Sequence, residues 1–239
     1  MSDIDFSPAA YLDLSKTSHS PLFAIGEPVW TAVGKIQSYL ESTLKPARLG
    51  EIMPGAFIGE QVYLGRGTRV MPGAVILGPA WIGDDCFVGP GCYIRENVII
   101  DHRSIVANSS EFKNCVLFEA CEAPHFNYVG DSLLGHKAHL GAGAVLSNWR
   151  LDHQPITIPR PDGGKIETGL PKFGAVVGDH VDIGCHSTIS PGSLLGRHSV
   201  IYPNTHWRGI LKSRQIVKLQ QSLQIVERLS SAHPSHPAP

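Results

Sequence analysis

The stretch WIGDDCFVGPGCYIRENVII, residues 81–100, carries an apolar residue at every sixth position. The same spacing extends in both directions, and the positions that share it are Ile52, Ile58, Leu64, Val70, Ile76, Ile82, Val88, Ile94, Ile100, Val106, Phe112 and Phe118. A mostly small residue follows four positions after each of them, as at Ala74 and Ala80. A six-residue period fits neither a helix nor a simply alternating strand. It predicts a mainly β chain, a left-handed parallel β-helix in which three hexapeptides wrap one coil.

Composition and charge narrow the class of protein further. The 239 residues fit one large domain or two small ones, and the net charge of −1 gives no attraction to nucleic acid or to a membrane. No run approaches the roughly 20 apolar residues of a membrane span, and the first twenty residues lack the pattern of a signal peptide. We therefore expect a cytoplasmic protein.

The cysteines indicate buried free thiols rather than a metal site. There are five of them and no CxxC motif, so a cysteine zinc site is not expected. Cys86 and Cys92 occupy small interior positions of the repeat, where a thiol packs as a small apolar group in a reducing compartment. No metal is expected.

The segments outside the repeat are expected to cover the β-helix. Residues 1–48 form an N-terminal arm and a helix over 28–44, whose apolar face we expect to cap the open end of the coils. Residues 207–239 form a C-terminal amphipathic helix at about 212–230 and a disordered tail.

The β-helix itself is expected over 49–206 with two interruptions. The six-residue spacing is lost at 119–128 and resumes one residue out of step. A second break, an insertion at about 148–173, contains Asp162-Gly163-Gly164, which predicts a hairpin. Insertions in a regular solenoid commonly lie on its functional face.

Two cations, Arg95 and Lys113, are eighteen residues apart and thus one coil apart on the same face. Neighbouring strands lie about 4.8 Å apart. Two like charges that close repel each other unless an anion lies between them. A phosphate would satisfy both, Arg95 as a fork and Lys113 as a point charge. The alternative is a pair of solvated surface cations with Glu111 or Glu119 as counter-ions.

A histidine follows twelve residues after Lys113. His125 lies inside the first break, and a histidine beside a phosphate site is a plausible general base because its pKa lies near neutral pH. One loop histidine among the twelve of this chain is a weak signal by itself.

The segment SEFKNCVLFEACEAPHFNYVGDSLLGHKAHLGAGAVLSNW, residues 110–149, carries a family resemblance. It resembles the acetyltransferase half of bacterial bifunctional N-acetylglucosamine-1-phosphate uridyltransferase. The whole chain is more similar still to stand-alone members of that group, which share Asp13-Leu14-Ser15 and the stretch from Arg150 to His180. The resemblance implies a homotrimer with active sites between subunits. It also implies acetyl transfer from acetyl-CoA to the amine of an amino sugar phosphate, with glucosamine-1-phosphate as the first candidate.

The same resemblance implies roles for individual residues. Arg95 and Lys113 would hold the sugar phosphate, and His125 would take a proton from the sugar ammonium. Glu111 would orient that histidine, and Tyr128 and Asn148 would line the sugar pocket. The family's pocket asparagine is replaced by His139.

Acetyl-CoA would lie near 180–205, where the family's serine aligns with Cys185 and a nearby alanine with Pro203. Backbone N–H groups of the Gly141-Ala142-Gly143 segment are candidates for binding the oxyanion.

Other functions compete with this interpretation. Uridyl transfer needs a nucleotide-binding domain of some 200 residues, and only about 48 residues precede the β-helix. A zinc hydrolyase would use histidines such as His136, His139, His180 and His186, but the expected spacing is absent. A non-catalytic solenoid that binds a sugar nucleotide, and an acyltransferase for a different amino sugar, also remain open.

Overall fold

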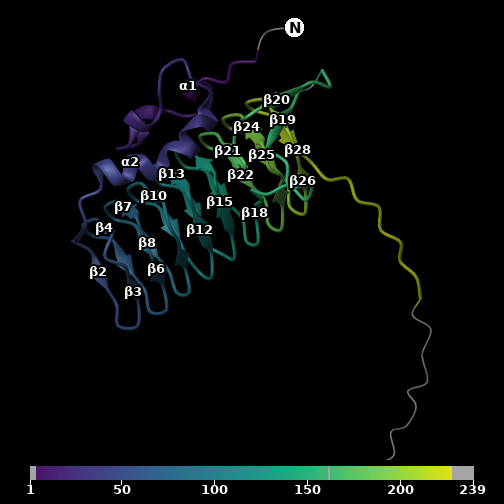
Figure 1. The fold of residues 1–239 in the computed structure, drawn as a ribbon. Coiled ribbons are helices and arrows are strands. Elements are labelled where there is room, and N and C mark those ends of the chain that lie inside the picture. Colours follow the sequence, from purple (N-terminus) through teal and green to yellow (C-terminus); the bar gives the residue numbers. More distant parts are fainter. Residues whose placement is uncertain (1–3, 161, 228–239) are drawn as a thin grey trace, which may run out of the picture.

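The chain winds through three parallel sheets in turn and forms an elongated prism (Figure 1). The computed structural model describes residues 4–160 and 162–227. Every pairing between strands of the prism is parallel, and each sheet takes one strand from nearly every coil. The predicted parallel β-helix is confirmed. We name the faces sheet A, sheet B and sheet C in the order in which the chain meets them.

The strands of the three sheets are as follows. Sheet A contains β1 (Ala47–Arg48), β4 (Val62–Leu64), β7 (Ala80–Ile82), β10 (Val98–Ile100), β13 (Cys115–Leu117), β16 (Leu133–Leu134), β21 (Ala175–Val177), β24 (Ser193–Leu195) and β27 (Ile210–Leu211). Sheet B contains β2 (Glu51–Ile52), β5 (Arg69–Val70), β8 (Phe87–Val88), β11 (Ile105–Val106), β14 (Glu122–Ala123), β17 (His139–Leu140), β22 (Asp182–Ile183), β25 (Val200–Ile201) and β28 (Ile216–Val217). Sheet C contains β3 (Phe57–Ile58), β6 (Val75–Ile76), β9 (Tyr93–Ile94), β12 (Glu111–Lys113), β15 (Tyr128–Gly130), β18 (Val145–Leu146), β23 (Thr188–Ile189) and β26 (His206–Trp207).

The predicted interior residues fill the prism up to Phe112, and there the register changes. Ile82 pairs with Ile100 and Ile100 with Leu117, so Leu117 rather than Phe118 takes the next interior place. Phe118 instead packs outside the prism, where its ring centroid lies 5.5 Å from that of Phe23. The predicted interior position of Phe118 is therefore wrong.

The break predicted at 119–128 is not a departure from the prism. Strands β14 and β15 lie within or at the end of this stretch and continue sheets B and C. The coil that runs from Ile100 to its partner Leu117 is one residue shorter than the earlier coils. The six-residue spacing therefore resumes one residue out of step. The insertion at about 148–173 is a real excursion, and β19 (Thr157–Pro159) pairs antiparallel with β20 (Lys165–Glu167). The predicted hairpin is confirmed.

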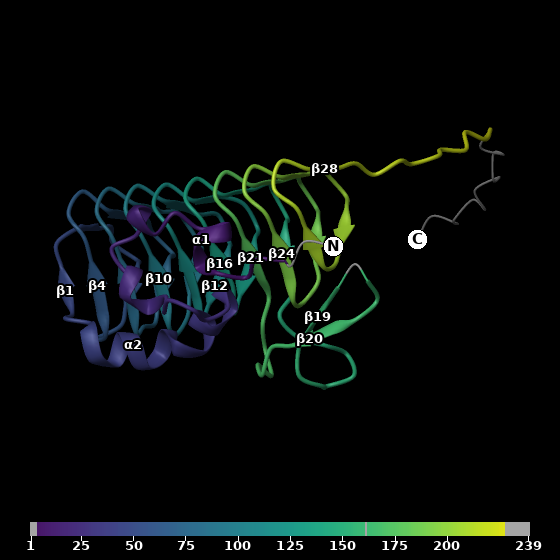
Figure 2. The same ribbon diagram turned by 90° about the horizontal axis from the view of Figure 1, so that it is seen from above.

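The N-terminal segment covers the earlier strands of sheet A and does not cap the end of the prism (Figure 2). Its elements are α1 (Pro8–Tyr11), η1 (Leu14–Lys16), η2 (Ser20–Leu22), η3 (Val29–Lys35) and α2 (Ile36–Thr43). The helix predicted over 28–44 is present as a 3₁₀ stretch, η3, that continues into α2. Its predicted capping position is wrong because the apolar face finds a better partner on sheet A.

That partner is a row of apolar side chains pointing outward from sheet A. Ile99, Val116 and Leu133 are fully buried against the N-terminal segment, which contributes Trp30 and Ile36. Central strands of sheet A are consequently apolar on both faces, whereas those of sheets B and C alternate. Burying this apolar surface stabilises the folded chain by about 25 cal/mol for each Å² removed from water.

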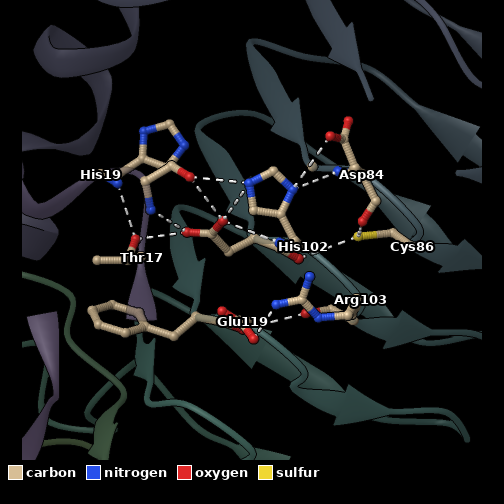
Figure 3. Close-up of polar contacts among 12 residues, drawn as sticks. Thr17, His19, Asp84, Cys86, His102, Arg103 and Glu119 are labelled. Atoms are coloured by element: carbon tan, nitrogen blue, oxygen red, sulfur yellow. Dashed lines mark hydrogen bonds and ion pairs between the residues drawn. The ribbon is translucent and has the colours of Figure 1, made fainter. Parts of the chain in front are cut away.

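The N-terminal arm is anchored to the prism by a buried carboxylate. Asp101 accepts hydrogen bonds from Thr17 Oγ1 at 2.7 Å and from the backbone N–H of Ser18 at 2.8 Å. Beside it, Nδ1 of His102 accepts the backbone N–H of Asp84 at 2.8 Å (Figure 3). This bond places the neutral imidazole proton on Nε2, which faces Ser18 Oγ at 3.1 Å. The neutral ring is therefore a donor to Ser18 and is not placed to activate its hydroxyl as a nucleophile.

His19 makes the docked arm sensitive to acid. Its ring is 7% exposed and packs edge-on against Trp81, and burial lowers the pKa of His19 to about 4 against the attraction of Asp101. The unfolded chain binds a proton near pH 6.5 and the folded chain only near pH 4, so stability falls as the pH drops through that window. We expect the free energy of unfolding to fall by about 2 kcal/mol between pH 7 and pH 5 from this group alone.

Urea unfolding at both pH values measures this loss, with His19→Gln as the comparison. The free energy of unfolding of wild type minus that of the variant should change by about 2 kcal/mol between the two pH values. If this difference in free energy is the same at both pH values, His19 is not buried as a neutral group.

The C-terminal end of the prism extends beyond its predicted boundary. Strands β26, β27 and β28 continue the three sheets to Val217, where a helix at about 212–230 was expected. No helix forms between 212 and 227, so that prediction is wrong for the described part of the segment. Ile216 pairs with Val200 as a strand residue. The tail predicted at 231–239 lies outside the described residues.

Candidate functional site

Sheet C presents Arg95 and Lys113 side by side on neighbouring coils. Tyr93 pairs with Glu111 and Ile94 with Phe112, so the next residues of the two strands are Arg95 and Lys113. Both cations already have carboxylate partners. Arg95 Nη1 lies 3.0 Å from Glu111, and Lys113 Nζ lies 3.5 Å from Asp131. Glu111 is thus the counter-ion that the sequence offered as an alternative, while Glu119 pairs with Arg103 (Figure 3).

Asp131 is a functional candidate that the sequence analysis missed. Its side chain is 6% exposed, and Oδ2 accepts a hydrogen bond from Asn148 at 2.5 Å as well as facing Lys113. Oδ1 accepts a hydrogen bond from Asn114 at 2.8 Å. The carboxylate therefore joins two of the predicted substrate-binding side chains, Lys113 and Asn148. Nothing in the six-residue spacing marks it, because it follows the outward Gly130 at a corner between sheets C and A.

Tyr128, Gly130 and Asn148 form the middle of the same face. A Cβ on Gly130 would lie 2.6 Å from Asn148 Nδ2 and 2.7 Å from Tyr128 Oη, so the two polar groups converge where a side chain would otherwise be. Burial raises the pKa of Tyr128, with a further contribution from Glu111. The phenol is therefore neutral at pH 7 and can donate a hydrogen bond.

Substituting Gly130 tests this convergence. In Gly130→Ala the new methyl group must displace Tyr128 or Asn148, and we expect KM for the sugar acceptor to rise at least tenfold. Steady-state kinetics measure the change, and Gly164→Ala in the hairpin turn is the control because Gly164 has no positive φ and a Cβ there would meet only the side chains of Asp162 and Arg160. A KM equal to that of wild type would exclude these two side chains from acceptor binding.

His125 lies at the corner between sheets B and C, in a column with the residues predicted to contact acetyl-CoA. The carbonyl of His125 accepts the N–H of Gly143, that of Ala142 accepts His186, and that of Cys185 accepts Asn204. His125, Ala142, Cys185 and Pro203 therefore occupy equivalent positions on successive coils. The sequence predicts each separately, and the structure brings them to one edge.

The orientation of His125 differs from the prediction. Its Nδ1 lies 3.1 Å from Asn108 Nδ2, and its backbone N–H donates to the buried Asn127 at 3.1 Å. Glu111, predicted to orient this histidine, instead pairs with Arg95. In this chain Asn108, which the sequence analysis missed, is the side chain that holds the imidazole.

The oxyanion-binding segment predicted at 141–143 is largely occupied. Gly141 N donates to Ile183 O at 2.7 Å and Gly143 N donates to His125 O at 2.9 Å. Those two N–H groups serve the coil-to-coil hydrogen bonds of the prism. They are therefore not available to stabilise a developing negative charge.

His139 lies on sheet B, away from the cations of sheet C. Its Nδ1 is 3.7 Å from Asp182 Oδ1 on the next strand. It lines a mainly apolar cavity of about 260 Å³ together with Cys185 and Pro203. Cys185 is exposed there, whereas Cys86 and Cys92 are buried free thiols as predicted. The structure thus groups His139 with the predicted donor residues and not with Arg95 and Lys113.

Within one chain the predicted residues form two groups. Arg95, Lys113 and Asn148 lie toward the sheet A end of sheet C, and His125 lies at its sheet B end. A strand residue advances about 3.3 Å. The five steps along the chain from His125 to Gly130 therefore separate the two ends by at most roughly 16 Å of backbone.

No group of three or more His, Cys, Asp or Glu side chains among the described residues is arranged to hold a metal ion. Likewise, residues 4–160 and 162–227 contain no helix with the length and apolar character needed to span a bilayer.

Known proteins with similar sequences identify the family. The chain is 33% identical over 173 residues to the putative uncharacterized acetyltransferase YaiX of Escherichia coli, and it covers 74% of that protein. This chain belongs to the hexapeptide-repeat acetyltransferases. It is also 34% identical over 180 residues to the bifunctional protein GlmU of Methanococcus vannielii. The acetyltransferase spans 42% of that archaeal protein's length.

Two further similarities are partial. The family described as GMPPB C-terminal domain matches residues 76–190 of the acetyltransferase. Among solved structures, UDP-N-acetylglucosamine acyltransferase from Campylobacter jejuni has a TM-score of 0.43 at 16% identity, with 68% of this chain and 69% of that chain covered.

Proposed function

We propose that this acetyltransferase transfers the acetyl group of acetyl-CoA to the amine of an amino sugar that carries a phosphate at C1. The observation that carries the proposal is the placement of Arg95 and Lys113 on adjacent coils beside Tyr128 and Asn148. A guanidinium has five N–H donors, so the ion pairs of Arg95 with Glu111 and Glu96 still leave donors for a phosphate. Glucosamine-1-phosphate is the first acceptor to test.

The reaction needs a neutral amine and a thioester held within reach of it. His125 would take a proton from the sugar ammonium, and the free amine would then attack the thioester carbonyl. The tetrahedral intermediate then collapses, which breaks the carbon–sulfur bond and leaves the amide. The nitrogen loses its second proton in this step, and the departing thiolate of CoA takes it up. Holding the two substrates in line would supply much of the rate enhancement by removing the entropic cost of their encounter.

Acetyl-CoA fits the corner formed by Ala142, Cys185 and Pro203. The cavity of about 260 Å³ beside that corner exposes mostly apolar atoms, which suit a pantetheine chain. Cys185 and Pro203 are both part of its wall. The thioester would then point toward His125, the preceding member of the same column of residues.

We further propose that the active enzyme is a homotrimer. The N-terminal segment and the insertion bury the outward face of sheet A and leave sheets B and C open. Phe57, Leu77 and Tyr93 on sheet C are exposed by 55%, 39% and 37%, an apolar surface that a neighbouring copy would cover. Such an assembly would bring sheet C of one copy toward the donor edge of another.

The five free cysteines agree with a cytoplasmic location.

Release of free CoA thiol tests the proposed function. The purified chain is mixed with acetyl-CoA and a panel of glucosamine-1-phosphate, glucosamine-6-phosphate and glucosamine. Thiol release should depend on the acceptor and be at least tenfold faster with the 1-phosphate than with unphosphorylated glucosamine. Equal rates with all three acceptors would remove the phosphate from the proposal.

A further inference from the structure

A cavity lies on the same face as the candidate sugar site but closer to the C-terminus. It has a volume of about 480 Å³ and lies between the insertion and the later coils of sheet C. Trp149, Arg150 and Arg208 contribute the large side chains of its wall, and Ser147 and Ser190 contribute small ones. Nothing in the proposed chemistry at His125 and Lys113 uses this space.

The cavity continues the column of side chains that begins with the two cations. Arg95, Lys113, Gly130, Ser147, Ser190 and Arg208 occupy equivalent outward positions on successive strands of sheet C. The middle members are glycine and serine, so the column is a shallow trough with basic residues at both ends. Four steps of about 4.8 Å place Arg208 roughly 19 Å from Lys113. That span is too long for one monosaccharide phosphate.

The charges around the cavity favour an anion. Arg150 is already held by Asp152 and donates from Nη1 to Thr157 Oγ1 at 3.1 Å. Lys172 Nζ lies 5.2 Å from the centre of the Trp149 ring. Within the described part of the chain Arg208 has no ion-pair partner, and its side chain is exposed at the rim. Three cations, Arg150, Lys172 and Arg208, therefore outnumber the two nearby carboxylates, Asp152 and Glu167.

An aromatic wall beside unpaired cations is suited to a planar group attached to phosphates. Trp149 is 40% exposed, which leaves part of the indole free to contact a ligand. Arg208 can bind phosphate oxygens through two parallel N–H bonds. Cavities of about 300–1,000 Å³ commonly hold molecules of nucleotide size.

We propose that this cavity binds the nucleoside diphosphate part of the acceptor, so that the preferred acceptor is a nucleotide-linked amino sugar. The inference rests on the proposed function for the position of the sugar beside Asn148. The chain itself links the two places, because Asn148 contacts Asp131 while its neighbours Ser147 and Trp149 line the cavity. The sugar would lie over Tyr128 and Asn148, and the nucleoside would extend along the trough toward Arg208.

Acetyl-CoA also carries a nucleoside diphosphate, but its candidate contacts are elsewhere. Ala142, Cys185 and Pro203 lie at the corner between sheets B and C. The cavity lies at the opposite end of the sheet C strands, where the insertion leaves the prism. Binding of the two ligands should therefore be independent.

Calorimetric titration of the full chain with UDP and with GDP tests the proposal. Both nucleotides are used because the lining residues do not indicate which base would bind. At least one of them should bind the wild type, and Arg208→Ala and Trp149→Ala should each weaken its binding at least tenfold. Arg66→Ala, which removes another exposed arginine, is the matched control and should bind like wild type. Circular dichroism on each variant confirms that the prism is intact.

Repeating the titration in the presence of saturating CoA shows whether the nucleotide binds at the acceptor site or at the site for CoA. Unchanged affinity supports an acceptor site, whereas loss of binding in the presence of CoA overturns it. Failure of both nucleotides to bind also overturns it. Neither result depends on acetyl transfer, so rapid acetylation of glucosamine-1-phosphate without nucleotide binding would refute only this inference. Nucleotide binding without any acetyl transfer would refute only the proposed function.

Discussion

His125→Ala is expected to lower kcat by two or more orders of magnitude while the chain keeps its fold. General base catalysis by a positioned side chain contributes about 10²- to 10⁴-fold, and the ammonium of an amino sugar cannot attack a thioester until it loses a proton. The substitution removes one hydrogen bond, to Asn108, from an exposed corner, and the backbone bond from Gly143 to residue 125 remains. Steady-state kinetics together with size-exclusion chromatography measure both parts of the prediction.

The pH dependence of the residual activity gives a sharper test. A dependence of kcat on a general base should appear in the pH profile of wild type and be absent from that of His125→Ala. His198→Ala removes an exposed histidine from another edge of the prism, between β24 and β25, and should behave like wild type. Full activity in His125→Ala would exclude this residue from the mechanism.

Lys113→Ala is expected to destabilise the fold as well as weaken acceptor binding. Asp131 is almost completely buried, and Lys113 is the cation that lies against it. Removing one partner of a buried ion pair leaves the other charge without compensation, which costs about 3 kcal/mol or more. We expect the free energy of unfolding to drop by about this amount and KM for the phosphorylated acceptor to rise at least tenfold.

The double variant Lys113→Met/Asp131→Asn separates these two effects. It removes both charges and keeps similar volumes, so most of the lost stability should return while KM stays high. Lys137→Ala, an exposed lysine on another edge, is the control for loss of positive charge. Unchanged stability in Lys113→Ala would mean that Asp131 does not depend on this cation.

Periodicity predicts the prism because every coil repeats the same packing problem. The large residue of each hexapeptide must fill the interior, so Ile82, Ile94 and Ile100 reveal the fold without any long-range information. The slip near Phe112 could not be placed from the sequence, since Leu117 and Phe118 are both large and apolar. Only the presence of Phe23 outside the prism decides which of them faces inward.

The flanking segments were harder to predict because their partners are far away in sequence. The apolar face around Trp30 and Ile36 signals a helix, but the matching row on sheet A appears only after the prism has formed. At the other end, Ile216 and Leu219 fit a helical spacing equally well. Pairing of Ile216 with Val200 makes the strand the better choice.

The candidate site was partly predictable for the same reason. An interval of eighteen residues is one coil, so the sequence alone places Arg95 beside Lys113. Side chains that reach across a corner follow no period. For this reason the sequence did not indicate Asp131 or Asn108. It also predicted that Glu111 orients His125, whereas Glu111 forms an ion pair with Arg95.

Identification of the acetylated atom tests the central claim most directly. The enzyme is supplied with glucosamine-1-phosphate and acetyl-CoA labelled at its acetyl carbonyl carbon, and the product is examined by NMR. Our account predicts an amide carbonyl on the C2 nitrogen, formed at a rate that falls at least a hundredfold in His125→Ala. A labelled ester on a sugar hydroxyl, or no transfer of label to any amino sugar phosphate, would contradict it.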